Sequence, residues 1–507
     1  MSRDPHLKSL FVPLAFFALT ALAIAGVWWW LGTPVRLRPS PLADGGKLYC
    51  VSYAPFRDAQ NPLVEGTRVS AEQIDEDLAF LSHYTNCIRT YSVDDGRDEV
   101  LKSARRYGLK VLHGIWISND REKTRRQIEA TVALAKEFSD VITAIVVGNE
   151  VLLRGEMSPA DLIGYIRDVK SRVSMPVTYA DVWEFWLRYP DVQNAVDFVT
   201  VHILPYWEDF PIPASLAAAH VEAIHKKVAE AFPNKEILIG EFGWPSAGRM
   251  REGARPSPSN QGRVIAETLA MAAREHFRVN VIEAFDQPWK RALEGVVGGY
   301  WGIFDRDTGK PKFGATVSDH PHWIGQAVAG IVLAGLIFAA AWGAGRGKSE
   351  PPLLWPRIAI LAFLPAVLFG WTIEMVPVES VGIGGWLRSL AFAATAATAP
   401  IACAAACAAG RKRPSLAVLM SRDAAFDGLG IMLGVSFAAL TLLSVQTALG
   451  LVFDPRYRDL PFAPQSAGVI AFLILAATGA RPQGPRAMAE TVAAAVLALS
   501  AVYIAFN

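Results

Sequence analysis

The stretch LIGEFGWPS, residues 238–246, places a carboxylate, Glu241, at the end of a short apolar run with a glycine close by on each side. A second stretch, VITAIVVGNE at residues 141–150, has the same form and ends in Glu150. Short runs rich in β-branched residues are typical of buried strands. Both stretches therefore predict strands that end in a glutamate.

Six further runs of this kind occur, at residues 47–54, 85–92, 109–118, 175–183, 197–206 and 279–289. Helical patterns lie between most of them, at residues 70–82, 121–138, 158–173, 214–232 and 259–277. The helix signal is weakest between the fifth and sixth strands. Eight strands alternating with helices over residues 46–320 predict an α/β fold, a (β/α)8 TIM barrel. A doubly wound sheet is the alternative, but its glycine-rich phosphate loop is missing after the first strand.

In such a barrel the two glutamates become candidate catalytic residues. Active sites of this fold lie at the carboxyl ends of the strands, and the fourth and seventh strands lie across the mouth from each other. Glycosidic bond cleavage needs one protonated carboxyl group and one ionised carboxylate, and two close carboxylates raise the pKa of one of them. A single glutamate at a strand end is more often a surface or helix N-terminal residue. Two in matching positions, Glu150 and Glu241, favour catalysis.

Neighbouring residues fit a sugar site. Asn149 offers an amide that could bind a sugar hydroxyl beside the reacting carbon. Arg89 and Tyr91 are two residues apart on the second predicted strand, so both side chains would lie on the same face and point toward Glu241. Aromatic rings near strand ends are candidate platforms for pyranose stacking, with core packing as the alternative for each. Tyr206, Trp244 and Trp289 are favoured because they directly follow strands. The whole set of candidates is Tyr53, Trp183, Trp186, Tyr206, Trp207, Trp244 and Trp289.

No metal or cofactor is predicted. His113 and His202 lie within strands, and neither has the sequence spacing of a metal-binding cluster. Of the four cysteines, Cys50 and Cys87 each fall in a predicted strand. A disulfide requires neighbouring strands and an oxidising compartment, and free buried thiols are favoured because adjacent strands rarely suit the bridge. Cys403 and Cys407 fit helix packing within an Ala-rich segment.

The overall composition, 52% hydrophobic with a net charge of +1, conceals two unlike regions. Residues 1–10 predict a short cytoplasmic N-terminus, and residues 11–31 an uncleaved signal-anchor helix. Residues 323–507 predict a membrane domain of about six helices, because apolar runs of about 20 residues suit a bilayer. Short basic segments separate some of these apolar runs and would lie in the cytoplasm; they include Arg346, Lys348 and residues 411–413. The candidate spans are residues 323–345, 357–377, 381–409, 427–452, 463–479 and 487–506, the fifth being the shortest.

The barrel region resembles glycoside hydrolase family 17, the β-1,3-glucanase family. The matching motifs are VSYAPF (51–56), IRTYS (88–92), VVGNE (146–150), VHILPYW (201–207), GEFGWPS (240–246) and EAFDQPWK (283–290). The resemblance implies Glu150 as acid/base, Glu241 as nucleophile and a β-1,3-linked glucan as substrate. It also implies roles for Glu283 and Lys290, which match polar positions that the family keeps near the eighth strand. One departure is Gln287, where the family usually has an acidic residue, which puts a polar network through that position in doubt.

The predicted membrane region limits which glucan-modifying activities are expected. The predicted cytoplasmic breaks are too short to bind a nucleotide sugar, which excludes direct polymerisation from that donor. A barrel followed by several spans resembles bacterial membrane proteins of β-(1,3)/(1,6)-glucan synthesis in rhizobia. The sequence therefore predicts a membrane-anchored retaining β-glucan transglycosylase that elongates, branches or cyclises glucan made by a separate synthase. Membrane-bound hydrolysis and a non-enzymatic glucan-binding scaffold are the alternatives.

These interpretations also set the expected location and partners. The chain is expected to cross the bacterial inner membrane several times, with the barrel in the periplasm. The expected partners are a β-1,3-linked glucan or oligosaccharide, the lipid bilayer and a membrane glucan synthase, and no nucleic acid.

Overall fold

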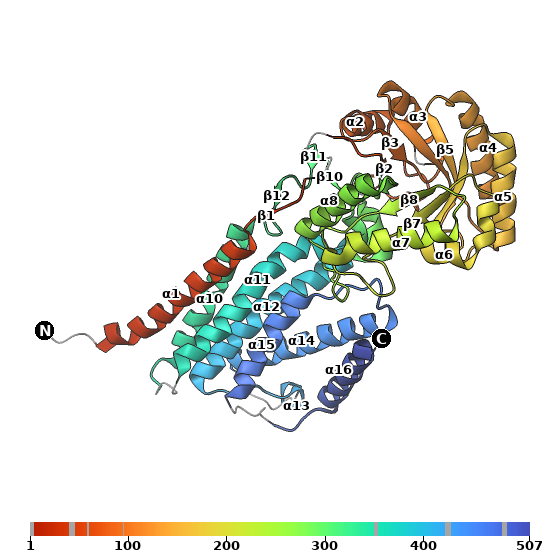
Figure 1. The fold of residues 1–507 in the computed structure, drawn as a ribbon. Helices are drawn as coiled ribbons and strands as arrows, with labels where there is room; N and C mark the ends of the chain where they lie inside the picture. Colours follow the sequence, from red (N-terminus) through yellow and green to blue (C-terminus); the bar gives the residue numbers. More distant parts are fainter. Residues whose placement is uncertain are drawn as a thin grey trace. The chain divides into compact units, whose positions relative to one another are not determined.

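The computed structural model describes residues 5–39, 46–57, 60–94, 96–348, 353–420, 427–478 and 484–506. The chain divides into two compact units (Figure 1). One consists of Pro34–Val317, and the other of Met1–Thr33 together with Ser318–Asn507. Residues 1–4, part of the expected cytoplasmic N-terminus, lie outside the described residues.

The first unit is built on a closed barrel of eight parallel strands in the order β2-β3-β4-β5-β6-β7-β8-β9. The predicted (β/α)8 fold is confirmed. The strands are β2 Cys50–Ser52, β3 Cys87–Arg89, β4 Lys110–Ile115, β5 Ile142–Asn149, β6 Val177–Val182, β7 Val199–His202, β8 Ile237–Phe242 and β9 Arg278–Val281.

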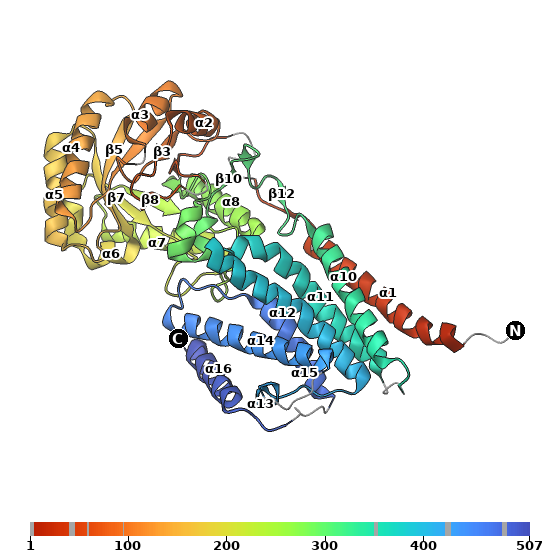
Figure 2. The same ribbon diagram turned by 180° about the vertical axis from the view of Figure 1, so that it is seen from behind.

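Helices follow the strands and surround the barrel (Figure 2). They are α2 Ala71–Leu81, α3 Arg97–Arg106, α4 Arg121–Glu137, α5 Pro159–Arg172, α6 Trp183–Arg188, α7 Ala217–Ala231 and α8 Pro258–Glu275. The short α6 lies between the fifth and sixth strands of the barrel, where the helix signal in the sequence is weakest. After β9 the chain forms only short helical turns, at Pro288–Lys290, Arg291–Glu294 (α9) and Val296–Gly299.

Local sequence explains where several helices begin. The side chains of Ser70, Asp120, Ser158 and Ser257 accept hydrogen bonds from backbone N–H groups in the first turns of α2, α4, α5 and α8. Such caps satisfy donors that have no partner within the helix. Along the strands, alternate residues join different apolar clusters: Ile88 and Val111 pack in the large cluster that includes the helices, whereas Cys87 and Leu112 join a smaller one. Because side chains alternate across a strand, the smaller cluster fills the barrel interior.

Cys50 and Cys87 form a disulfide, with 4.4 Å between their Cα atoms. The expectation of two free thiols was therefore wrong. The two residues are neighbours on paired strands, since Val51 lies opposite Ile88 in the β2–β3 register. The sequence places each cysteine at the start of its strand, but it does not specify the register that brings them together.

We expect this disulfide to stabilise the barrel unit. A cross-link between residues 37 apart in the sequence restricts the unfolded chain, so replacing both cysteines with alanine lowers the free energy of unfolding by about 2–4 kcal/mol. Thermal unfolding of the full-length protein measures the change. Replacing the free cysteines Cys403 and Cys407 is the matched control. Equal melting temperatures for Cys50→Ala/Cys87→Ala and the unaltered protein would contradict the expectation.

The connections into and out of the barrel unit lie side by side. Strand β1, Val35–Arg36, pairs antiparallel with β12, Thr316–Val317. This pairing is why the unit begins at Pro34, earlier than the predicted boundary at residue 46. A second ribbon, β10 Phe304–Asp305 with β11 Lys310–Pro311, lies in the segment between β9 and β12.

The second unit is helical, and α1 packs beside α10 and α11 (Figure 1). Six of its described helices are long and apolar enough to cross a membrane. The expected span at 463–479 corresponds to a helix of only 16 residues, α15. The helices are α1 Pro5–Leu31, α10 Trp323–Gly345, α11 Leu354–Glu379, α12 Gly382–Ala409, α13 Leu416–Leu419, α14 Gly428–Phe453, α15 Phe462–Ala477 and α16 Met488–Phe506.

Candidate active site

Glu150 and Glu241 meet at the carboxyl ends of β5 and β8. An oxygen of each carboxylate and a ring nitrogen of His202 all lie within 4.8 Å of one another. Glu241 is almost fully buried, whereas 22% of the Glu150 side chain is exposed. The two glutamates that the sequence places at matching strand ends are therefore close enough to act on one bond.

His202 lies between the two carboxylates. Its Nδ1 is 2.7 Å from Oε1 of Glu150, and its Nε2 is 3.5 Å from Oε1 of Glu241. The sequence interpretation, which set His202 apart from any cluster, was wrong on this point. The signal it lacked is register: β7 and β8 shift against each other between Val201 and His202, so that His202 pairs with Glu241.

Arg89 is the positive centre of the site, and only 1% of it is exposed. Its Nη1 donates to the carbonyl oxygen of Gly240 at 2.7 Å and to Oε1 of Glu241 at 3.3 Å, and its Nη2 donates to Oδ1 of Asn149 at 2.6 Å. Arg89 Nη1 also lies 3.2 Å from His202 Nε2. Because a guanidinium only donates, Nε2 of His202 is the acceptor in this contact, and Nδ1 is the ring nitrogen that faces Glu150.

The fixed charge of Arg89 bears on whether the site would hold a metal. Glu150, His202 and Glu241 are close enough to share an ion. The guanidinium already lies against Glu241 and His202, and it neutralises the carboxylate as a cation would. The donor set is therefore explained by hydrogen bonding within the protein.

Tyr91 completes the surroundings of Glu241. Its hydroxyl donates to Oε1 of Glu241 at 2.9 Å and lies 2.9 Å from Oγ of Ser52. Burial, followed by the charge of Glu241, raises the pKa of the Tyr91 hydroxyl. Tyr91 therefore keeps its proton and remains a donor. Arg89 and Tyr91, which share a parity on the second strand, both reach Glu241.

The two glutamates have unequal surroundings. Burial raises the pKa of Glu150, but the hydrogen bond from His202, together with the positive charges of Arg154 and Arg89, outweighs burial and holds the pKa below its ordinary value. Glu241 accepts from two donors, Arg89 and Tyr91, which both hold its Oε1. The contact with His202 thus favours the ionised form of Glu150.

A second polar group follows β9. Glu283 lies in the left-handed backbone region, with φ +57°, and Lys290 Nζ donates to its Oε1. Burial raises the pKa of Glu283 to about 7. Burial lowers the pKa of Lys290, but the charge of Glu283 reverses this and raises it. Both residues that the family resemblance implied therefore contact each other.

Glu294 and Gln287 add details that the sequence did not settle. Burial raises the pKa of Glu294, and the charges of Glu150 and Glu241 raise it further despite Lys290. Sequence reasoning missed Glu294 because it follows no strand directly. A polar network is present at Gln287, although the residue departs from the family pattern. Its Nε2 donates to the Ala54 carbonyl at 3.2 Å, and its Oε1 accepts from Trp289 Nε1 at 2.9 Å.

Most of the predicted aromatic platforms are packing residues. Four of the seven, Tyr53, Trp186, Tyr206 and Trp244, are at most 1% exposed. The polar atom of each is used: Tyr53 donates to Asp77, and Trp186, Tyr206 and Trp244 donate to the carbonyl oxygens of Thr200, Arg249 and Arg255. Such buried rings present no face to a sugar, so their assignment as platforms is corrected.

The remaining aromatic candidates are only partly buried. Trp183 lies under Lys227 of α7, 4.4 Å from the ring centre, and its Nε1 donates to Glu208. Trp207 stacks on Trp301, with ring centres 6.3 Å apart. Trp207 and Trp289 are half-buried, and both follow strands of the barrel, β7 and β9. They are the aromatic residues best suited to contact a sugar.

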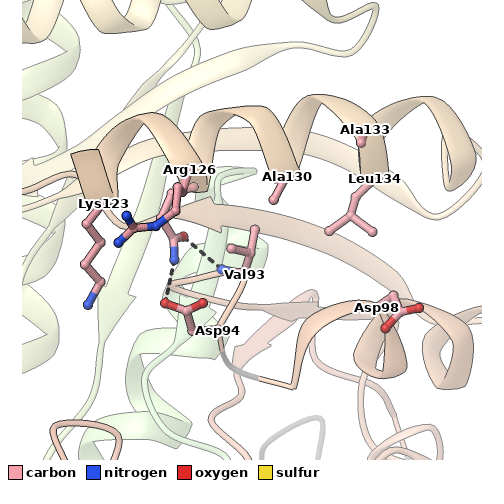
Figure 3. A pocket seen from close by; sticks show the side chains of 9 residues that line it. Val93, Asp94, Asp98, Lys123, Arg126, Ala130, Ala133 and Leu134 are labelled. Carbon is pink, nitrogen blue, oxygen red and sulfur yellow. Dashed lines mark hydrogen bonds between the residues drawn. The ribbon is translucent and has the colours of Figure 1, made fainter. Parts of the chain in front are cut away.

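A surface groove elsewhere on the unit is distinct from this site. It has a volume of about 480 Å³ and lies between α4 and the segment after β3 (Figure 3). Gln127 donates to Asp94 across one end of it. Its lining contains neither Glu150 nor Glu241.

Known proteins resemble the barrel unit. Residues 50–302 match the family model described as the BtgE/BtgC glycoside hydrolase domain. The putative glucan endo-1,3-beta-glucosidase btgC of Aspergillus niger is 28% identical over 267 residues, covering 47% of this chain and 39% of its own. The glucan 1,3-beta-glucosidase of Arthroderma benhamiae is 28% identical over 261 residues, covering 48% of this chain and 83% of its own.

A solved structure also matches this part of the chain. The glycoside hydrolase family 17 beta-1,3-glucanosyltransferase from Rhizomucor miehei is 24% identical, with a TM-score of 0.46, covering 53% of this chain and 98% of that one. The residues that the family model matches include the strands that carry Glu150 and Glu241. The chain therefore contains, over residues 50–302, a domain similar to the BtgE/BtgC glycoside hydrolase domain and to glucan glucosidases, among them a probable family 17 glucosidase of Saccharomyces cerevisiae.

Proposed function

We propose that the barrel is a retaining β-1,3-glucan glucanosyltransferase in which Glu241 is the nucleophile and Glu150 the acid/base. The observation that carries the proposal is the closeness of the two carboxylates, with oxygens within 4.8 Å. Retaining enzymes place their carboxyl groups about 5–5.5 Å apart, whereas inverting enzymes leave about 6.5–9.5 Å for a water molecule. Direct attack by Glu241 on the sugar fits the shorter separation.

The first half of the reaction forms a covalent intermediate. An ionised Glu241 oxygen attacks the anomeric carbon, the bond to the leaving oxygen breaks, and Glu150 gives that oxygen its proton. Arg89 and Tyr91 hold Glu241 in place through Oε1, so the other oxygen, Oε2, is the attacking atom. Holding the nucleophile rigidly in this way contributes to catalysis by orientation.

Glu150 must carry a proton in this step. Its Oε1 faces His202 Nδ1 at 2.7 Å, which favours the carboxylate. A leaving oxygen that binds Glu150 replaces this contact, and burial, which favours the neutral acid, then dominates. Asn149 is oriented for substrate as well, because its Oδ1 is held by Arg89 and its NH₂ group is left to donate to a sugar hydroxyl.

The second half distinguishes transfer from hydrolysis. Glu150 takes a proton from the incoming hydroxyl, whose oxygen displaces Glu241 from the anomeric carbon. A sugar hydroxyl gives a new glycosidic bond, and water gives hydrolysis. We favour a sugar acceptor because six long apolar helices accompany the barrel, which suits an enzyme that modifies glucan where it emerges from a membrane-bound synthase.

The location proposed for the barrel is the outer side of a bacterial inner membrane, in the periplasm. Two observations support it. The disulfide between Cys50 and Cys87 suits an oxidising compartment. Basic residues between predicted spans, among them Arg346, Lys348 and Arg411, suit the cytoplasmic side.

Product analysis tests the proposed transfer. The full-length protein in detergent is incubated with linear β-1,3-gluco-oligosaccharides, and the products are examined by mass spectrometry and linkage analysis. Products longer than the donor, branched, or lighter by one water as a ring support transfer. Shorter sugars alone would make the protein a hydrolase. No change would favour a glucan-binding scaffold.

Trp207 provides a test of the substrate-binding surface. We expect Trp207→Ala to raise KM for oligosaccharides about tenfold, since stacking and burial of an aromatic ring contribute on the order of 1–2 kcal/mol. Trp244→Phe is the comparison: the buried Trp244 should affect the melting temperature and leave KM nearly unchanged. An unchanged KM in Trp207→Ala would remove Trp207 from the proposed site.

A further inference from the structure

The chain is distorted where it presents Glu150. Glu150 has φ +54° and Gly148 has φ +89°, and the β5–β6 register is irregular between Val146 and Asn149. A residue with a Cβ atom in the left-handed region costs roughly 1–2 kcal/mol. Such a conformation persists only where the surrounding structure holds it. The groups that hold this turn therefore help to position Glu150.

Strand β6 supplies these groups. The Glu150 N–H donates to the Ala180 carbonyl at 2.8 Å. The next donors bind side chains of the same strand: Leu152 N–H donates to the Tyr179 hydroxyl at 3.0 Å, and Leu153 N–H donates to Oδ2 of Asp181 at 3.4 Å. Three backbone donors of the turn at residues 150–153 are thus fixed by one strand.

Tyr179 and Asp181 form a buried pair. They are 1% and 0% exposed, and the Tyr179 hydroxyl donates to Oδ2 of Asp181. Oδ1 of Asp181 accepts from the Val182 N–H at 2.8 Å. Buried polar groups with all partners satisfied are rigid. This pair reaches no substrate itself, because the turn that ends β5 covers it.

Asp181 also acts on Glu150 through charge. Burial raises the pKa of Asp181 to about 6, and the charge of Glu150 contributes to that rise. The interaction is mutual, so an ionised Asp181 opposes ionisation of Glu150. Other charged or titratable groups also act on the carboxyl group of Glu150, on that of Asp181, or on both. They are Arg89, Arg154, Tyr179, His202 and Glu294. Glu241 lies close to Glu150 as well.

We propose that Tyr179 and Asp181 are positioning residues that hold the turn bearing Glu150 and keep Glu150 protonated for proton transfer. The inference rests on the proposed function, in which Glu150 is the acid/base. Neither residue was singled out in the sequence, because both lie inside a strand and their partners come from the end of the preceding one.

The test measures kcat and KM against pH for the full-length protein in detergent, acting on β-1,3-gluco-oligosaccharides. Above pH 6 the ionised Asp181 opposes loss of the Glu150 proton in the substrate complex. Asp181→Asn removes that charge, so the basic limb of kcat should move to lower pH by about half a unit to one unit. Tyr179→Phe keeps the carboxyl group but loses the acceptor of Leu152. It should lower kcat about tenfold with KM changed less than about twofold.

The chain offers a matched control on the opposite side of the barrel. Asp77 is also buried and accepts from a tyrosine hydroxyl, that of Tyr53, at 3.0 Å. Asp77→Asn should lower the melting temperature without moving the basic limb of kcat. This comparison separates the loss of any buried Asp–Tyr pair from the loss of the pair beside Glu150.

The outcomes distinguish the two proposals. An active protein whose basic limb is unmoved in Asp181→Asn, or moves equally in Asp77→Asn, overturns the inference and leaves the proposed function standing. If Asp181→Asn does not fold, Tyr179→Phe decides: a lower melting temperature with unchanged kcat per folded molecule overturns the inference. An unaltered protein without turnover overturns the proposed function and the inference that rests on it.

Discussion

Glu241→Gln should abolish transfer, with kcat/KM lowered by about 10⁴-fold or more, equivalent to ~5 kcal/mol of transition-state stabilisation. The glutamine is nearly isosteric and can still accept from Arg89 and Tyr91, which bond Oε1 of Glu241 in the unaltered protein. It has no ionised oxygen to attack the anomeric carbon. Initial rates of product formation, measured by chromatography of oligosaccharides, give the ratio.

Two controls make this result specific. Binding of the oligosaccharide, measured by calorimetry, should survive in Glu241→Gln because the sugar-contacting residues remain. Glu283→Gln removes another buried carboxyl group near the site and should retain more activity than Glu241→Gln. A Glu241→Gln protein that is folded and keeps even a tenth of the activity would exclude Glu241 as the nucleophile.

Arg89→Lys should fold but lose about 10²-fold in kcat/KM, which corresponds to ~3 kcal/mol. One guanidinium joins Glu241, Asn149 and the Gly240 carbonyl in a fixed fork. An ammonium group is a compact donor that does not reproduce this fork. Lysine keeps the positive charge beside Glu241, so the loss in kcat/KM measures how much the guanidinium contributes by orienting Glu241 and Asn149.

Arg57→Lys is the matched control for Arg89. Arg57 bridges Glu76 and Asp77 in the same unit, away from the two catalytic candidates. We expect it to lower the melting temperature, because the partner Asp77 is buried, and to change kcat/KM by less than about twofold. If Arg89→Lys behaves like Arg57→Lys, the guanidinium fork is not needed for catalysis.

The fold and the two central carboxylates, Glu150 and Glu241, could be predicted from the sequence for one reason. Short apolar strands alternate regularly with helices along the chain, and Glu150 directly follows β5 while Glu241 is the penultimate residue of β8. Once a barrel is inferred, its geometry brings the fourth and seventh strand ends to the same mouth. Arg89 and Tyr91 could be assigned to the site for the same reason, because alternate residues of a strand share a face.

The residues that the sequence missed depend on register and packing. His202 reaches both carboxylates because the register between β7 and β8 shifts by one residue at that point. Such a register shift cannot be predicted from a hydropathy pattern. The Cys50–Cys87 bond likewise depends on the register between β2 and β3. Tyr206 and Trp244 follow strands as a sugar platform would, but the loops fold over them. Burial by distant segments is not visible in the local sequence.

The configuration of the first product is the most direct test of the account. The full-length protein is mixed with a β-1,3-gluco-oligosaccharide in deuterated buffer, and the anomeric proton of the newly released or transferred sugar is followed by NMR before mutarotation. Two displacements at Glu241 predict a β product. A product formed first as the α anomer would mean a single displacement, and it would contradict the proposed role of Glu241.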